Sequence, residues 1–170
     1  MHLLIIRHAV AEEKEAWAAT GEPDERRPLT ADGRKKMRRA TRGLRHLAPS
    51  IDLLGASPLV RAAQTAEIVA DVYGALAPVT VGALTPERAP GDFLSWLRDA
   101  APGHEAVAAV GHEPHLSGLV SWLLTGRAAP SVVELKKGAA CLIRFDGEPK
   151  KGEGCLAWLL QPRQLRQLDV

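Results

Sequence analysis

A basic dipeptide, Arg7-His8, directly follows the first apolar run of the chain, residues 3–6. The run is short, branched and uncharged, which is typical of a strand that is buried on both faces. Open α/β sheets bind their ligands outside the carboxyl ends of the strands. A histidine beside an arginine at such a position supplies a nucleophile and an anion-binding group. Taken alone the pair is a weak signal, because polar pairs at strand ends are common.

Two further strand ends repeat this pattern. Residues 51–56 lead to Ser57, and Arg61 falls in the first turn of the helix that follows; residues 106–110 lead to His112, again just before a helix. Helix N-termini favour anions, and arginine binds phosphate oxygens through two parallel hydrogen bonds. Two arginines and two histidines at one sheet edge therefore suit a phosphoryl group. Positive guanidinium groups would oppose a metal cation, so we predict no metal and no cofactor.

Strands and helices, which must position these groups, are expected to alternate along the chain. This alternation predicts an α/β fold of three α/β/α layers with a mostly parallel central sheet, one antiparallel edge region and no large cap insertion. No repeat or long linker interrupts the pattern, so we expect a single domain over residues 1–170. The expected strands are 3–6, 51–56, 79–81, 106–110, 132–135, 140–145 and 155–160, and the expected helices are a basic helix after the N-cap candidate Thr30, then 59–73, about 91–99 and about 114–124.

Composition excludes several classes of protein. The formal net charge is only +2, which does not by itself indicate a nucleic-acid partner. No apolar run approaches the roughly 20 residues that a membrane-spanning helix needs, and we see no signal peptide before the first strand. Cys141 and Cys155 lie far apart and are expected to be small buried hydrophobic residues, not a disulfide or a metal pair. These features favour the cytoplasm.

The basic helix admits two interpretations. Apolar residues recur at helical spacing on one side, so its charges decorate the solvent side of an amphipathic helix. They form either a solvated face or an approach surface for an acidic or phosphorylated partner. The basic side chains concerned are Arg34, Lys35, Lys36, Arg38, Arg39, Arg42 and Arg45.

Taken together, the segments resemble the histidine phosphatase superfamily (phosphoglycerate mutase-like), whose hallmark is Arg-His-Gly after a strand. They most resemble the short bacterial SixA-type phosphohistidine phosphatases. The segments occur in family order and span residues 3 to about 125, with a weaker tail at 158–162. They are Leu4-Ile5-Ile6-Arg7-His8-Ala9, Arg27-Pro28-Leu29-Thr30, Ser57-Pro58-Leu59-Val60-Arg61-Ala62-Ala63-Gln64-Thr65-Ala66 and Val110-Gly111-His112-Glu113-Pro114.

The resemblance implies a role for each matching residue. His8 would attack phosphorus and become a phosphohistidine that water then hydrolyses. Arg7, Arg61 and His112 would hold the phosphoryl oxygens. Arg27 would be a secondary phosphate or substrate contact. Ser57 would either donate its hydroxyl to the substrate or cap the following helix.

The sequence departs from the family pattern in two places. Ala9 replaces the usual glycine. An alanine disfavours a positive φ, so the backbone at this position is not expected to adopt one. The general acid is also not evident. Glu113 follows His112 as in the acid phosphatase branch, and Glu87 lies in the region where larger relatives carry a glutamate. The alternative for each is a solvated charge at a helix end. His115 is expected to be an exposed residue at a helix start.

Three functions follow as alternatives. The first is a phosphatase that removes a phosphoryl group from phosphohistidine in a signalling protein, for example a histidine phosphotransfer domain. The second acts on a small phosphorylated substrate such as a nucleotide, sugar phosphate or polyphosphate, and both release inorganic phosphate. The third is a non-catalytic phosphate-binding module, which would not need a nucleophile. A missing acid mildly favours phosphohistidine, because imidazole leaves more easily than an alkoxide.

Overall fold

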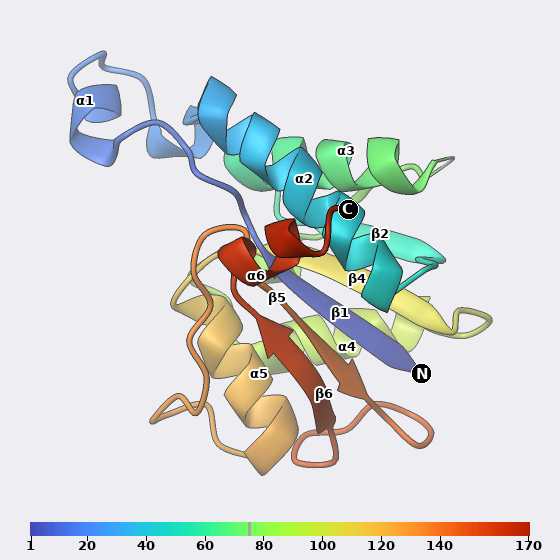
Figure 1. Cartoon of the computed structure of the whole chain (residues 1–170). Helices are drawn as coiled ribbons and strands as arrows, with labels where there is room; N and C mark the ends of the chain where they lie inside the picture. Colours follow the sequence, from blue (N-terminus) through green and yellow to red (C-terminus); the bar gives the residue numbers. More distant parts are fainter. Residues whose placement is uncertain (75) are drawn as a thin grey trace.

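The computed structural model describes residues 1–74 and 76–170. Its central sheet has the strand order β3-β2-β4-β1-β5-β6 (Figure 1). The strands β3, β2, β4 and β1 pair with their neighbours in parallel. β5 pairs antiparallel with β1 on one side and with β6 on the other. The predicted mostly parallel sheet with an antiparallel edge region is therefore confirmed. The strands are β1 (His2–Arg7), β2 (Leu53–Ala56), β3 (Val79–Thr80), β4 (Ala106–Gly111), β5 (Ala140–Arg144) and β6 (Cys155–Leu160).

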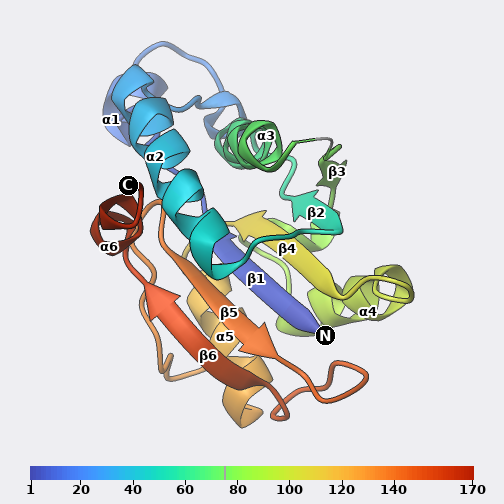
Figure 2. The same ribbon diagram turned by 45° about the vertical axis from the view of Figure 1, so that its right-hand side comes forward.

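Helices cover both faces of the sheet and make the three predicted layers. Figure 2 shows α2, α3 and α6 on one face and α4 and α5 on the other. The side chains of β1 alternate accordingly: Leu4 and Ile6 pack in the core under α2 and α3, whereas Leu3 and Ile5 pack in the core under α4 and α5. The helices are α1 (Lys14–Ala18), α2 (Ala31–Leu47), α3 (Val60–Tyr73), α4 (Pro90–Ala100), α5 (His115–Thr125) and α6 (Pro162–Gln167), with short 3₁₀ turns at Asp24–Arg26 and Gly82–Leu84.

The strand predicted over residues 132–135 is wrong. The backbone N–H of Val132 donates to the hydroxyl of Ser121 at 2.8 Å, and the carbonyl of Leu135 accepts from Arg7 at 2.7 Å. These backbone groups therefore bond to side chains instead of joining the sheet. The sequence prediction also missed α6, although Pro162 in its first turn and the reciprocal capping box of Gln161 and Gln164 are both signals of a helix start.

Three neighbouring strands bring the predicted site residues to the same edge. In the parallel registers Ala56 of β2 and Ile6 of β1 both pair with Val110 of β4. The chain continuing from each of these strands therefore leaves the sheet at one level. This places Arg7-His8, Ser57 and His112 side by side at the carboxyl edge.

The basic helix α2 is charged on its solvent side, but many of its charges are paired within the chain. Lys36 pairs with Asp32 at 2.6 Å, and Arg38 pairs with Asp71 of α3 at 3.2 Å. The carboxylate of Asp169, near the carboxyl terminus, forms ion pairs with both Arg39 and Arg42. These ion pairs link α2 to the neighbouring elements. Over the described ranges, no helix is long and apolar enough to cross a membrane.

Candidate active site

His8 lies immediately after β1 and is only 5% exposed. Its Nδ1 lies 2.7 Å from the carbonyl oxygen of Ala9, which can only accept, so the proton of the neutral ring is on Nδ1. Nε2 is thereby left with a free lone pair. The next peptide is itself held, because the N–H of Ala9 donates to Oγ1 of Thr65 at 3.1 Å, and that hydroxyl donates to the carbonyl of Arg61 at 2.7 Å. The fold fixes both the tautomer and the ring.

The surroundings of His8 keep its ring unprotonated. Burial lowers the pKa of His8 to about 3, and the charges of Arg61, Arg7 and Lys137 act in the same direction, against the hydrogen bond to Ala9. A neutral imidazole is the form that can attack phosphorus. His8 is therefore neutral over the whole physiological pH range, which is the protonation state that a nucleophilic histidine needs.

His112 faces His8 from the end of β4. The two ring centroids are 5.1 Å apart and the rings are inclined by 50°. Burial, with the charge interactions of His8, Arg61 and His115, lowers the pKa of His112 to about 2. Its Nε2 lies 2.8 Å from Oγ of Ser57. That oxygen already accepts the N–H of Leu59 at 3.4 Å, so its own proton is available for Nε2.

A neutral His112 that accepts from Ser57 carries its proton on Nδ1. Nδ1 is buried and has no partner among the described residues, so it is a free donor. Ser57 thus orients His112. The alternative that Ser57 caps the following helix is wrong, because its hydroxyl accepts from Leu59, the residue before α3, and the first turn of α3 has no side-chain cap among the described residues.

The two arginines are anchored by their terminal nitrogens. Nη1 of Arg7 donates to the carbonyl of Leu135 at 2.7 Å. Nη1 of Arg61 donates to the carbonyl of Asp24 at 3.0 Å, and its Nη2 lies 3.1 Å from the carboxylate of the same residue. Burial lowers the pKa of both guanidinium groups, but arginine remains charged at any physiological pH.

Arg27 is also buried and belongs to the same cluster. Its Nε donates to the carboxylate of Asp24 at 2.8 Å, and its Nη1 donates to the carbonyl of Glu12 at 2.8 Å. Burial opposes ionisation of Asp24, but the hydrogen bond from Arg27 and the charges of Arg61 and Arg27 hold its pKa below the usual range. One carboxylate therefore links the two arginines.

Unpartnered donors mark the place of a ligand. Within residues 1–74 and 76–170, Nε of Arg7, Nε of Arg61 and Nδ1 of His112 are buried without a hydrogen-bond partner. A buried donor without a partner is costly and calls for an explanation. An oxyanion held at the strand ends beside His8 would satisfy all three donors. The arrangement can therefore bind a phosphoryl group within reach of a free imidazole nitrogen.

The acid candidates occupy different environments. Glu113 accepts from the hydroxyl and the backbone N–H of Ser117 at 2.5 and 3.3 Å through Oε2, and its Oε1 is buried without a partner. Glu87 is exposed, and its charge acts on His115. The expectation for His115 is wrong: it is 6% exposed, because the start of α5 packs into the sheet edge, and neither ring nitrogen has a partner in the described chain.

Sequence reasoning missed two residues that hold the site together. Asp24 stands in a stretch rich in exposed acids, where only its spacing of three residues before Arg27 gave a signal. Thr65 lies one turn after Arg61 in α3 and is fully buried. The hydroxyl of a threonine inside a helix usually donates to a backbone carbonyl of the same helix. Only the fold shows that the hydroxyl of Thr65 also accepts a hydrogen bond from the backbone N–H of Ala9.

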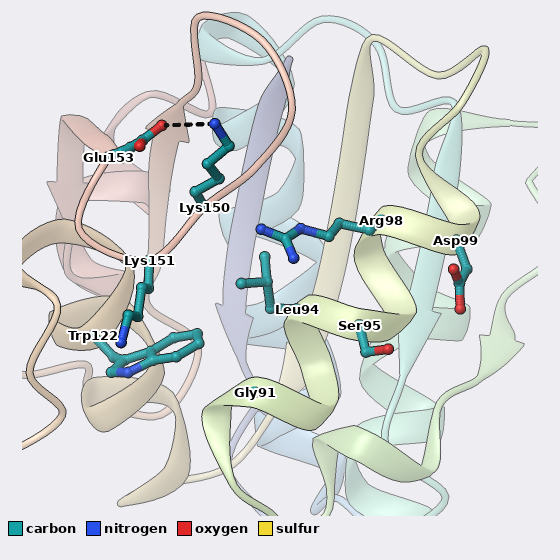
Figure 3. A pocket seen from close by; sticks show the side chains of 9 residues that line it. All are labelled: Gly91, Leu94, Ser95, Arg98, Asp99, Trp122, Lys150, Lys151 and Glu153. Carbon is teal, nitrogen blue, oxygen red and sulfur yellow. Dashed lines mark ion pairs between the residues drawn. The ribbon is translucent and has the colours of Figure 1, made fainter.

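Other features of the described residues lie apart from this cluster. Cys141 is buried as predicted, but the prediction for Cys155 is wrong, because its side chain is exposed on the edge strand β6. They contain no group of three or more His, Cys, Asp or Glu side chains arranged to hold a metal ion. A hollow of about 600 Å³ lies along α4, where Arg98 and Leu94 face Trp122 and Lys151 (Figure 3). It contains neither histidine of the site and neither arginine. It is separate from the candidate active site.

Comparison with known proteins agrees with this arrangement. The chain is 32% identical over 149 residues to an uncharacterized protein of Picosynechococcus, covering 82% of this chain and 87% of the relative. It is also similar to a solved structure of the protein histidine phosphatase SixA complexed with tungstate, at 26% identity, a TM-score of 0.81 and coverage of 97% and 99% of the two chains.

More distant structures share the fold. A candidate phosphohistidine phosphatase SixA from Agrobacterium tumefaciens has a TM-score of 0.74 at 20% identity, with 94% and 96% of the chains covered. An alpha-ribazole phosphatase from Shigella flexneri has a TM-score of 0.67 at 18% identity, with 94% and 96% covered. The sequence profile of the histidine phosphatase superfamily (branch 1) matches residues 3–94. With this match over more than half of its length, and with an Arg-His pair at the end of its first strand, the chain belongs to the histidine phosphatase superfamily.

Proposed function

We propose that this protein removes the phosphoryl group from phosphohistidine in another protein. The observation that carries the proposal is the neutral His8 ring, whose free Nε2 stands among buried, unpartnered N–H donors. A non-catalytic phosphate-binding module would need the donors but not a histidine with a fixed tautomer. The site therefore favours catalysis over binding alone.

The reaction divides into two phosphoryl transfers. In the first, Nε2 of His8 forms a bond to phosphorus while the bond from phosphorus to the substrate nitrogen breaks. The substrate imidazole leaves and takes up a proton. In the second, water attacks phosphorus, the bond to Nε2 breaks, and inorganic phosphate is released. The donors of Arg7, Arg61 and His112 stabilise the charge on the transferring oxygens in both steps.

Two considerations support phosphohistidine as the substrate. Over residues 1–74 and 76–170 the sheet edge carries no large inserted cap, which leaves it open to a group on a protein surface. Imidazole is also a better leaving group than an alkoxide and depends less on a strong general acid. The likeness to a protein histidine phosphatase adds weight at 26% identity. We further propose a signalling protein as the partner, in the cytoplasm, where the free Cys141 and Cys155 would stay reduced.

A small-molecule phosphatase is the second candidate. It is favoured by the shared fold with the alpha-ribazole phosphatase, although a likeness at 18% identity concerns the fold alone. The small substrates would be nucleotides, sugar phosphates or polyphosphate. Their alcohol or phosphate leaving groups would place a heavier demand on an acid such as Glu113.

A substrate panel with a trapping step tests the proposal. The purified protein is given a phosphohistidine protein, p-nitrophenyl phosphate, a nucleotide and polyphosphate, and we expect the highest kcat/KM on the first. A brief reaction stopped without acid should yield an acid-labile, base-stable phosphoenzyme at His8. Tungstate, a tetrahedral oxyanion like phosphate, should inhibit competitively.

His8→Ala serves as the matched control. We expect no turnover and no phosphoenzyme, with a circular dichroism spectrum like that of the unmodified protein. Substantial activity in this variant would contradict the covalent mechanism. A clear preference for a nucleotide or sugar phosphate would instead support the second candidate.

A further inference from the structure

A small hollow shares its walls with the site of His8. It measures about 180 Å³ and is lined by Ala9 and Val10, by Met37 and Ala40 of α2, and by Gly138. The carbonyl of Ala9 holds Nδ1 of His8, and the N–H of Gly138 donates to the carbonyls of Arg7 and His8 at 3.2 and 3.0 Å. The residues that orient the nucleophile therefore also form one side of this hollow.

The rim of the hollow is cationic. Lys36, Lys137 and Arg166 line it, and the described residues contribute no acidic side chain to its lining. Lys36 pairs with Asp32 at 2.6 Å, so its charge is largely compensated. Lys137 and Arg166 have no ion pair among the described residues. The charge of Lys137 also acts on His8, which places the rim within electrostatic range of the nucleophile.

The size of the hollow limits what it can hold. Pockets that enclose a whole small-molecule ligand measure about 300–1,000 Å³, and this hollow is smaller. Its floor is buried and apolar, since Met37 and Ala40 are only 2% and 1% exposed. One side chain with an apolar stem and an anionic end would match both the floor and the rim.

We infer that the hollow is a specificity subsite for a carboxylate side chain that lies near the phosphorylated residue of the substrate protein, with Lys137 and Arg166 as its cationic contacts. This inference rests on the proposed function and narrows its substrate to phosphoproteins with acidic surroundings. A glutamate entering the hollow would place its stem against Met37 and its carboxylate at the rim. The two contacts would act on substrate binding, while Arg7, Arg61 and His112 act on the phosphoryl group.

Binding to stable peptides tests the subsite separately from turnover. The peptides carry a non-hydrolysable triazolyl phosphonate in place of phosphohistidine. In each peptide a single glutamate occupies one of the flanking positions, and a matching peptide has glutamine at that position. Exposed ion pairs are individually weak, so the protein should bind at least one glutamate peptide only about three- to tenfold more tightly than the matching glutamine peptide. The preference should weaken with added salt.

Variants on the same elements provide the controls. Combining Lys137→Gln with Arg166→Gln should bring the ratio of the two dissociation constants close to one. Lys136→Gln and Arg163→Gln remove neighbouring cations outside the hollow and should keep the preference. Equal binding of both peptides at every position would overturn the inference, as would a preference that survives in the double variant or disappears in the controls.

A separate turnover measurement tests the proposed function. Hydrolysable phosphohistidine peptides of the same sequences are tested for turnover by the unmodified protein. Absence of turnover on all of them would refute the phosphohistidine assignment, whatever the binding ratios show. Turnover of all peptides with equal binding constants would retain the function and reject the subsite.

Discussion

Asp24 holds both terminal nitrogens of Arg61: its carbonyl accepts from Nη1 at 3.0 Å, and its carboxylate lies 3.1 Å from Nη2. The same carboxylate accepts from Nε of Arg27 at 2.8 Å. Nε of Arg61 takes no part in these contacts and is buried without a partner among the described residues. Asp24 is a positioning residue, because it orients the guanidinium that would contact the phosphoryl oxygens.

Replacing Asp24 tests this positioning. Asp24→Asn keeps the backbone carbonyl but removes the charge that holds two arginines, so we expect kcat/KM to fall by about ten- to a hundredfold, the scale of a small misplacement in an active site. Initial rates on a phosphohistidine protein provide the measurement. Glu25→Gln, a neighbouring exposed position, is the control and should stay within about twofold. Activity unchanged in Asp24→Asn would show that Arg61 needs no such partner.

The arginines should divide the work unequally. Arg7 and Arg61 each offer a free Nε donor, so Arg7→Ala and Arg61→Ala should each lose about 10² or more in kcat/KM. Arg27 is engaged with Asp24 and the carbonyl of Glu12, and Arg27→Ala should lose less. Steady-state kinetics on one substrate compare the three variants. A larger loss in Arg27→Ala than in Arg61→Ala would contradict the division.

Stability should depend on pH through the buried histidines His8, His112 and His115, because burial lowers the pKa of each ring. Above about pH 6.5 both the folded and the unfolded chain hold these rings neutral, so they cost nothing. Below it the unfolded chain binds protons that the folded chain refuses, since the pKa values of His8 and His112 are about 3 and about 2. The free energy of unfolding should therefore fall as the pH falls, by about 1.4 kcal/mol per pH unit for each ring.

Urea denaturation between about pH 7.5 and 5 measures this dependence. His8→Ala removes one of these rings and should reduce the slope of the unfolding free energy against pH by about a third to a half. His46→Gln changes an exposed histidine on α2 and should leave the slope nearly as it was. Parallel curves for the unmodified protein and His8→Ala would show that His8 is protonated in the folded chain.

Catalysis should not require a divalent ion. Arg7 and Arg61 supply positive charge at the strand ends, where a metal would otherwise stand, so activity should persist after dialysis against a chelator. The rate on a phosphohistidine protein is compared before and after the treatment and after adding back Mg²⁺, Mn²⁺ or Zn²⁺. Full loss in the chelator with recovery on adding one of these ions would indicate a different class of enzyme.

The sequence predicted most of the fold because its strongest signals are local. Apolar runs such as residues 3–6 and 106–110 mark buried strands, and parallel strands must deliver Arg7, His8 and His112 to one edge. The segment 132–135 was misread since an apolar stretch does not reveal that its backbone groups bond to Ser121 and Arg7. The same reason hid Asp24, Thr65 and the burial of His115. Asp24 and Thr65 bond to Arg61 and Ala9, which lie far away in the sequence, and His115 is buried by segments that only the folded chain brings against it.

Glu113→Gln separates the two substrate classes. Oε2 of Glu113 accepts from Ser117, whereas the buried Oε1 has no partner in the described chain and is the atom from which a leaving group could take a proton. Imidazole leaves readily, so this variant should keep most of its activity on a phosphohistidine protein. On an alkyl phosphate the activity of the same variant should fall steeply, because an alkoxide must be protonated as it leaves.

Glu87→Gln, on an exposed residue, is the companion variant in the same two assays. Equal and large losses on both substrates in Glu113→Gln would contradict the argument from the leaving group. No loss on either would make Glu113 a structural partner of Ser117, and the response of Glu87→Gln would then decide whether that residue is the acid.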